Sequence, residues 1–283
     1  LEPTELILIH GKSLTVSEGR TTLKRDGGGT APELLKEPWI YEDNQFIVIE
    51  LDGTLKKGDK YRLYIEFQGP LLDDLLGYYW MSYTTAAGEK RFLASTFFDP
   101  VDARKAFPCF DEPAMKATFT ITLEHEPKYH ALANSPKSGD DVELSDGWIR
   151  ATFEETVKMP TYLVCYVVSD FKAKYMTTEH GVTFGVWSQE DFINQTDYAL
   201  EKGAAILDFF DELYGMDIKY PMAKMDMIAL PDFTAGAMEN WGLITYRESA
   251  LLYEEGVSSE SQKQRVCTIV SHELAHQWFG NLV

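Results

Sequence analysis

The chain changes its hydrophobic period once, near residue 190, and this change limits the folds open to it. Up to about residue 188, segments such as 45–51 and 61–67 alternate apolar with polar side chains and are rich in β-branched and aromatic residues, as strands are. From residue 196 onwards, apolar residues recur at helical spacing in 196–215 and 258–280. We therefore predict an α+β protein, with an antiparallel sandwich or saddle-like sheet over 1–188 and an α+β segment over 189–283.

Length, charge and cysteine usage narrow the class of protein. The 283 residues are enough for one large domain or two moderate ones. The 26 basic and 45 acidic residues give a net charge of −19, which argues against a nucleic-acid partner because phosphate neutralisation needs clustered Lys and Arg. No apolar run approaches the roughly 18 residues of a membrane-spanning helix. The widely spaced Cys109, Cys165 and Cys267 predict free, buried thiols rather than a disulfide framework.

The second predicted helix contains the pattern His272-Glu273-x-x-His276. At about 100° per residue, the two histidines lie about 40° apart on one face and can bind the same metal ion. Glu273 lies about 100° from His272 and can reach a water molecule without binding the metal. Such a pattern also occurs by chance, and two helical histidines can simply be core residues. We predict a zinc site with His272 and His276 as ligands and Glu273 as general base.

A second motif, Gly236-Ala237-Met238-Glu239-Asn240, lies some thirty residues upstream. A carboxylate such as that of Glu239 can bind a cationic α-amino group, and a backbone with small side chains can pair with an extended peptide. Together with the histidine pattern and the segments FPCFDEP at 107–113 and YRESALLY at 246–253, this motif resembles the gluzincin aminopeptidase family, the aminopeptidase N-like enzymes.

The resemblance implies a fold and an activity. Residues 1–188 would form an N-terminal β-saddle domain, and residues 189–283 the first part of a thermolysin-like catalytic domain. The implied activity is zinc-dependent removal of N-terminal residues from peptides with a free N-terminus, with Glu273 activating the attacking water. Glu239 would hold the substrate amine, which limits cleavage to the first residue. The neighbouring Gly236, Ala237, Met238 and Asn240 would line the substrate site.

The chain departs from the family pattern at three points. Phe97 stands where the family usually has a glutamine that contacts the substrate amine and first side chain. A phenylalanine removes an acceptor and adds an apolar wall, so we expect an altered first-residue preference or weaker amine binding. The family's third zinc ligand and its oxyanion-stabilising tyrosine would both lie beyond Val283. We therefore expect a chain that is truncated at both ends and inactive alone.

Two other functions stay open, a thermolysin-type endopeptidase and a non-enzymatic cell-surface receptor. An endopeptidase would need another purpose for Glu239, and the intact motifs argue against a fully degenerate enzyme. The resemblance implies an extracellular, membrane-anchored ectodomain whose anchor lies outside the chain, although cytoplasmic relatives exist. The glycosylation sequon Asn194-Gln195-Thr196 agrees with the extracellular location.

Overall fold

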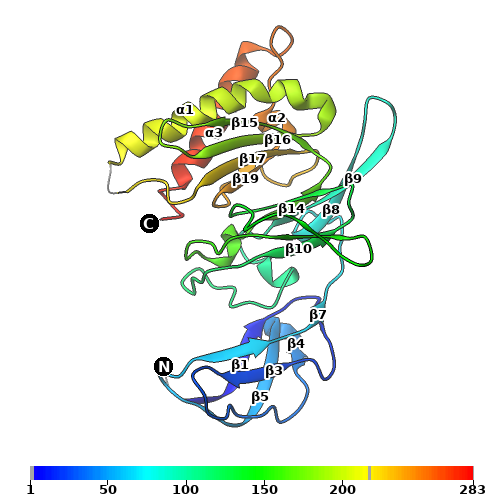
Figure 1. The fold of residues 1–283 in the computed structure, drawn as a ribbon, viewed down its shortest axis with the longest axis vertical. Coiled ribbons are helices and arrows are strands. Elements are labelled where there is room, and N and C mark those ends of the chain that lie inside the picture. The colour runs from blue at the N-terminus through cyan, green and yellow to red at the C-terminus, as the bar shows by residue number, and fades with distance from the viewer. Residues whose placement is uncertain (1–2, 216–217, 283) are drawn as a thin grey trace.

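The computed structural model describes residues 3–215 and 218–282 and arranges them in three layers along its longest axis (Figure 1). The first 70 residues make the lower layer, the central part of the chain makes the middle layer, and the last 110 residues or so make the upper layer with its helices. Strands dominate the lower two layers, which confirms the α+β class. Among the described residues, no helix combines the length and apolar character needed to cross a membrane.

The lower layer is a small antiparallel β unit with its own core. Its main sheet has the order β1-β5-β4, and Ile9 pairs with Ile47 in register. Alternation places Ile9, Ile47 and Ile49 on the inner face, as the period-two pattern predicts. The strands of this layer are β1 (Thr4–His10), β2 (Thr15–Val16), β3 (Thr22–Arg25), β4 (Trp39–Tyr41), β5 (Phe46–Leu55), β6 (Tyr61–Tyr64) and β7 (Phe67–Gln68), with a 3-10 turn at Glu42–Asn44.

The middle layer consists of a four-stranded sheet in the order β11-β14-β9-β8 and a three-stranded sheet in the order β10-β13-β12. All strand pairs in it are antiparallel. Its elements are β8 (Gly77–Thr84), β9 (Lys90–Phe97), β10 (Thr122–His125), β11 (His130–Ala133), β12 (Val142–Glu143), β13 (Ile149–Thr152) and β14 (Tyr166–Ser169), with 3-10 turns at Ala103–Lys105 and Thr161–Leu163.

A polar junction joins the lower and middle layers through the segment 107–113. The backbones of His10 and Cys109 exchange two hydrogen bonds of 2.8 and 3.1 Å. The buried carboxylate of Asp111 accepts from Arg104 Nε at 2.8 Å and from the Thr161 hydroxyl at 2.6 Å. Cys109 and Cys165 are free and buried, as predicted, and the free Cys267 is partly exposed.

The upper layer is a mixed five-stranded sheet covered by helices. Its order is β15-β16-β17-β19-β18; β16, β17 and β19 run parallel, while β15 and β18 pair antiparallel at the two edges. Helices α1 and α3 lie side by side on one face of this sheet (Figure 1). The elements are β15 (Lys172–Thr177), β16 (Thr183–Ser188), a 3-10 segment (Glu190–Thr196), α1 (Asp197–Leu213), β17 (Lys224–Leu230), β18 (Ala237–Met238), β19 (Leu243–Arg247), α2 (Glu248–Leu251) and α3 (Glu260–His276).

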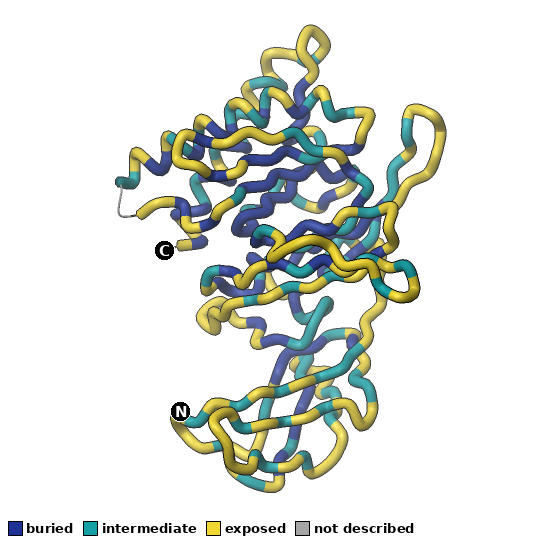
Figure 2. The backbone as a smooth tube through the Cα atoms, in the orientation of Figure 1, coloured by how far each residue is buried: buried dark blue, intermediate teal, exposed yellow. Residues whose placement is uncertain are grey.

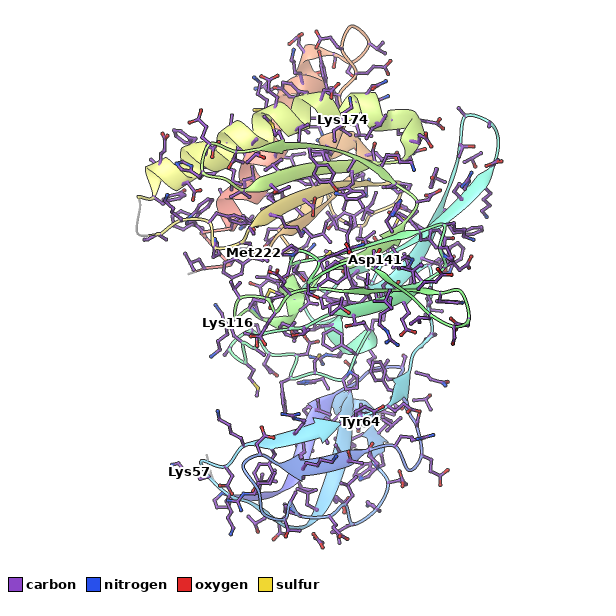
Figure 3. All side chains as sticks on the ribbon, viewed as in Figure 1. Lys57, Tyr64, Lys116, Asp141, Lys174 and Met222 are labelled. Atoms are coloured by element: carbon purple, nitrogen blue, oxygen red, sulfur yellow. The ribbon has the colours of Figure 1, made fainter. Side chains whose placement is uncertain are left out.

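One hydrophobic core runs through the middle and upper layers. Buried segments are densest along β17 and β19 (Figure 2). Met222 lies where the two layers meet (Figure 3), and Gly242 packs so closely there that an added Cβ would lie 2.3 Å from the Asn134 carbonyl oxygen. The segments that carry the two motifs therefore pack on one continuous hydrophobic core.

Strands β15 and β16 belong to the upper sheet, although they come before residue 189 in the sequence. The domain division at 188/189 stays a prediction.

Candidate active site

Helix α3 fixes the predicted metal-binding residues by burying one face against the upper sheet. The helix begins after Ser259, whose hydroxyl accepts a hydrogen bond from the Gln262 backbone N–H at 3.2 Å and caps the helix. Val266, Val270 and Leu274, at helical spacing, are completely buried. This anchoring leaves the neighbouring face free to present the histidines.

The two histidine rings converge as the i, i+4 spacing predicts. His272 Nε2 and His276 Nε2 lie 3.1 Å apart. His276 Nδ1 lies 2.9 Å from the Phe279 carbonyl oxygen, which can only accept, so Nδ1 carries the proton and Nε2 keeps a free lone pair. The hydrogen-bonded ring is thus held in the tautomer that a metal ligand requires.

This pair fits one edge of a zinc site. Zn–N bonds of about 2.0–2.1 Å at a tetrahedral angle place two ligand nitrogens roughly 3.4 Å apart, close to the observed separation. Within residues 3–215 and 218–282, no group of three or more His, Cys, Asp or Glu side chains is arranged to hold a metal ion. If His272 and His276 bind zinc as predicted, they supply two ligands of a donor set that needs a third.

Glu273 follows His272 directly in α3 and is largely closed off from solvent. Its side chain is 5% exposed, and its Oε2 has no hydrogen-bond partner in the described part of the chain. Burial, together with the negative charge of Glu239, raises the pKa of Glu273 to about 8. A nearby dication would oppose this rise. An unpartnered, proton-accepting carboxyl group next to the histidines suits a general base.

The second motif forms the free edge of the upper sheet. In β18, Ala237 pairs with Tyr246 and Met238 with Thr245 of β19. Among the described residues, no strand pairs with the other side of β18. A Cβ added at Gly236 would meet no atom within 4 Å, so the backbone there borders open space. An extended peptide can add to such an edge through main-chain hydrogen bonds.

Glu239 follows this edge strand and is half-buried. Its negative charge acts on Glu273 and also on Asp99, whose pKa is raised by burial and by Glu239. The same two causes raise the pKa of Tyr162, with Asp99 contributing as well. We refer to Glu239, Glu273 and Asp99 as the carboxylate cluster, because the negative charge of Glu239 acts on the other two carboxyl groups. A bound cation would offset this repulsion.

Asp99 is the site residue that sequence reasoning missed. It follows β9 directly and lies two positions after Phe97, in an otherwise apolar stretch. A single carboxylate in an apolar stretch is the sequence signal that could have pointed to Asp99. The sequence does not show that Asp99 comes near Glu239, because that depends on how the middle layer packs against the upper layer.

The remaining predicted residues occupy buried positions near the cluster. Phe97 is 8% exposed, and its ring meets that of Phe233 edge-on at 5.1 Å, just before the second motif. The Met238 side chain is buried in the core. The Asn240 side chain is buried too and donates to the Thr245 hydroxyl at 3.2 Å, which holds the turn after β18. These buried side chains pack beneath the segment 236–240.

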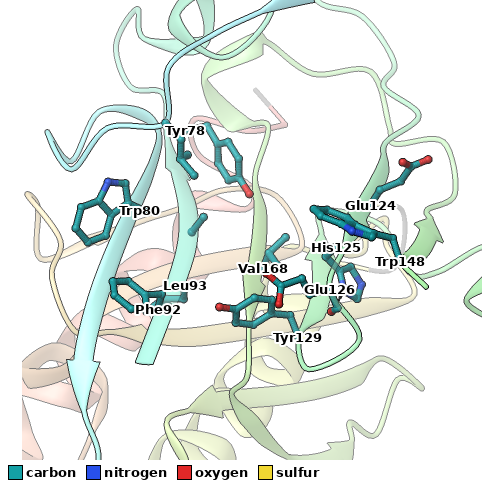
Figure 4. Close-up of a pocket in the computed structure, with 12 residues that line it drawn as sticks. Tyr78, Trp80, Phe92, Leu93, Glu124, His125, Glu126, Tyr129, Trp148 and Val168 are labelled. Atoms are coloured by element: carbon teal, nitrogen blue, oxygen red, sulfur yellow. Dashed lines mark hydrogen bonds between the residues drawn. The ribbon is translucent and has the colours of Figure 1, made fainter. Parts of the chain in front are cut away.

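A separate pocket on the middle layer contains none of the predicted site residues. Figure 4 shows its aromatic lining, with Trp80 and Phe92 on one side and Trp148 on the other. His125 and Tyr129 line it as well. The predicted metal-binding residues and Glu239 lie on the upper layer's elements instead, and Asp99 follows the middle-layer strand β9.

Comparison with known families agrees with these two motifs. Residues 1–163 match the Peptidase M1 N-terminal domain, and residues 198–283 match the Peptidase family M1 domain. The first match alone covers more than half of the chain. The chain belongs to peptidase family M1. The order of the two matches confirms a β domain followed by the first part of the M1 catalytic domain.

Individual M1 relatives are similar along the whole chain. Rat aminopeptidase N is 45% identical over 288 residues, human aminopeptidase N is 44% identical over 288 residues, and rat endoplasmic reticulum aminopeptidase 1 is 43% identical over 282 residues. Each comparison covers 100% of this chain and 29% or 30% of the relative, so the chain spans about 30% of the length of these M1 proteins. Aminopeptidases of family M1 are zinc-dependent, which confirms Zn²⁺ as the predicted cofactor.

Proposed function

We propose that the protein containing this chain is a zinc-dependent aminopeptidase that removes N-terminal residues from peptides. The main support is that Gln277 Nε2 donates to the backbone carbonyl oxygens of both Glu239, at 3.2 Å, and Glu273, at 3.0 Å, so the two residues lie close together. A group suited to bind an α-ammonium ion therefore adjoins a group suited to activate water. Membership in family M1 supports the same activity.

His272 and His276 would hold the zinc ion through Nε2, with a further ligand completing the set. When bound, zinc supplies a Lewis acid that polarises the scissile carbonyl group and makes water more acidic. Phe279 keeps His276 in the correct tautomer through its carbonyl oxygen. The separation of 3.1 Å between the two Nε2 atoms supports this role.

Glu273 would accept a proton from the attacking water on its carboxylate and later deliver it to the leaving amine. Its burial excludes bulk water from the transfer. Glu273 must be in its carboxylate form to accept the proton, and a nearby dication would favour that form by opposing the rise in its pKa.

Glu239 and Asp99 would bind the substrate's free N-terminus. An α-ammonium ion relieves the repulsion between the two carboxylates, whereas an acetylated N-terminus has no charge to offer. The free edge of β18, from Gly236 to Met238, would align the peptide backbone beside them. Because the amine is held next to the metal helix, only the first peptide bond reaches the reacting groups.

We also propose that this protein acts outside the cytoplasm on peptides presented at a cell surface. Asn194 of the sequon is exposed, and its side chain contacts only Lys174 Nζ at 3.3 Å among the described residues. A glycosidase that removes N-linked glycans should shift the mobility of the secreted protein, and an Asn194→Gln variant should lose that shift. If the glycosidase does not change the mobility of the wild-type protein, the result argues against this location.

The activity is tested by following peptide products of the full-length protein by mass spectrometry. Stepwise loss of N-terminal residues, abolished by a zinc chelator and absent with N-acetylated peptides, is expected. Internal cleavage of acetylated peptides would instead support a thermolysin-type endopeptidase. No cleavage of either peptide by zinc-loaded protein would support a receptor without enzymatic activity.

A further inference from the structure

Two buried amide side chains at the end of the metal helix hold the backbone of Glu239. Gln277 Nε2 donates to the Glu239 carbonyl oxygen at 3.2 Å, and Asn281 Nδ2 donates to the same oxygen at 3.0 Å. Both side chains are almost completely buried, at 1% and 0% exposed. Both lone pairs of the Glu239 carbonyl oxygen therefore accept hydrogen bonds, and both donors come from the segment that follows His276.

The same residues are fixed to the metal helix itself. Gln277 Nε2 also donates to the Glu273 carbonyl oxygen at 3.0 Å. One amide group therefore connects the backbone of Glu273, the proposed general base, with the backbone of Glu239, the proposed amine-binding residue. The Asn281 backbone N–H donates to the His276 carbonyl oxygen at 3.1 Å. The orientation of both amides is set by these acceptors, because a flipped amide would turn its own oxygen towards a carbonyl oxygen.

These contacts cross between segments that are far apart in sequence. β18 and β19 hold the second motif from one side, through Ala237 and Met238. Beyond Met238 the chain leaves the strand, and the Asn240 side chain bonds within the turn itself. For Glu239, the amides of Gln277 and Asn281 are thus the side-chain contacts that connect its backbone to α3.

We propose that Gln277 and Asn281 are positioning residues that set the distance between the amine-binding carboxylate of Glu239 and the metal-binding helix. The proposal rests on the proposed aminopeptidase function. Neither side chain touches substrate; each acts through the Glu239 backbone. Because reacting groups must be placed within a fraction of an ångström, a loosened Glu239 would hold the amine in the wrong place relative to the metal.

The test uses a pair of inhibitors that differ only in the amino group. Leucine hydroxamate can bind both the metal and Glu239, whereas the hydroxamate of the corresponding acid without the amino group can bind only the metal. Inhibition constants are measured for both with the full-length, zinc-loaded protein. We expect Asn281→Leu and Gln277→Met to lower the preference for the amino compound about tenfold and to leave the affinity of the other compound unchanged.

Matched variants separate positioning from general damage. Gln262 lies on the same helix and donates through Nε2 to the Ser249 and Leu252 carbonyl oxygens, so Gln262→Met removes a comparable pair of contacts away from Glu239. It should keep the wild-type preference. Glu239→Ala should abolish the preference altogether. Zinc content and the unfolding midpoint, measured for every variant, show which proteins are loaded and folded.

Each outcome decides the matter. Equal weakening of both inhibitors in Asn281→Leu and Gln277→Met, or an unchanged preference, overturns the positioning role while Glu239→Ala still confirms amine binding. A wild-type protein with no preference, unaffected by Glu239→Ala, overturns the proposed function and the positioning role with it. If Asn281→Leu fails to fold, Asn281→Ala replaces it, and if Gln277→Met fails to fold, Gln277→Ala replaces it, under the same expectation.

Discussion

At the scale of the residue, the account depends most on Glu273. Replacing it by glutamine keeps the shape of the side chain and removes its ability to accept a proton. General acid–base catalysis contributes about 10²–10⁴-fold, so we expect Glu273→Gln to lower kcat by that factor with little change in KM. The zinc content should match that of the wild type. Steady-state kinetics on an aminoacyl substrate measures the effect, and a kcat within threefold of wild type would rule out Glu273 as the base.

Phe97 is the residue at which this chain should differ functionally from its relatives. Its ring packs on Phe233 beside the second motif, so glutamine there restores a polar group and removes apolar wall. We expect Phe97→Gln to change the ratio of kcat/KM for apolar and polar first residues by about tenfold, within the range for one pocket contact.

The matched control for Phe97 is Phe92→Gln on the same strand. Phe92 is exposed and lines the separate aromatic pocket, so this variant should keep the wild-type substrate ratios. If the two variants give the same ratios, Phe97 has no part in selecting the first residue.

At the scale of the element, the helix was predictable and the sheet membership was not. An i, i+4 pair of histidines on a helix is placed by helix geometry alone, and the structure confirms their convergence. Alternation predicted strands up to about residue 188 but did not reveal the parallel pairing of β16 with β17. Pairing partners depend on contacts distant in sequence, which a local period does not encode. The approach of Asp99 to Glu239 escaped prediction for the same reason.

The junction between the lower and middle layers should weaken in acid because of His10. Burial, followed by the charge of Arg104, lowers the pKa of His10 from its ordinary value of 6.5, while Asp111 and Glu112 oppose this effect. The folded protein therefore favours the neutral ring. The stabilising contribution is complete above pH 6.5 and is lost as the pH falls towards the lowered pKa.

This pH dependence is measured from urea unfolding midpoints between pH 7.5 and 5. We expect His10→Gln, which keeps an acceptor for the Asp111 backbone N–H, to reduce the loss of stability over that interval. A steeper loss in His10→Gln than in the wild type would contradict the assigned sign.

At the scale of the whole molecule, the layers bring two distant motifs to one place. Glu239 comes from the edge of the upper sheet, Glu273 from the helix that covers it, and Asp99 from the end of a middle-layer strand. The continuous core between these layers holds the three carboxylates at fixed positions. The lower layer has its own core, contributes none of the predicted site residues, and joins the middle layer at the junction at 107–113.

The most direct test of the central claim compares one aminoacyl substrate with its N-acetylated form in wild type and Glu239→Ala. The account predicts that wild-type kcat/KM for the free-amine substrate exceeds that for the acetylated one by at least about 100-fold, the scale of two lost charge-assisted hydrogen bonds. In Glu239→Ala the two values should approach each other, through loss of activity on the free-amine substrate. An undiminished ratio in Glu239→Ala would contradict the claim that this carboxylate recognises the N-terminus.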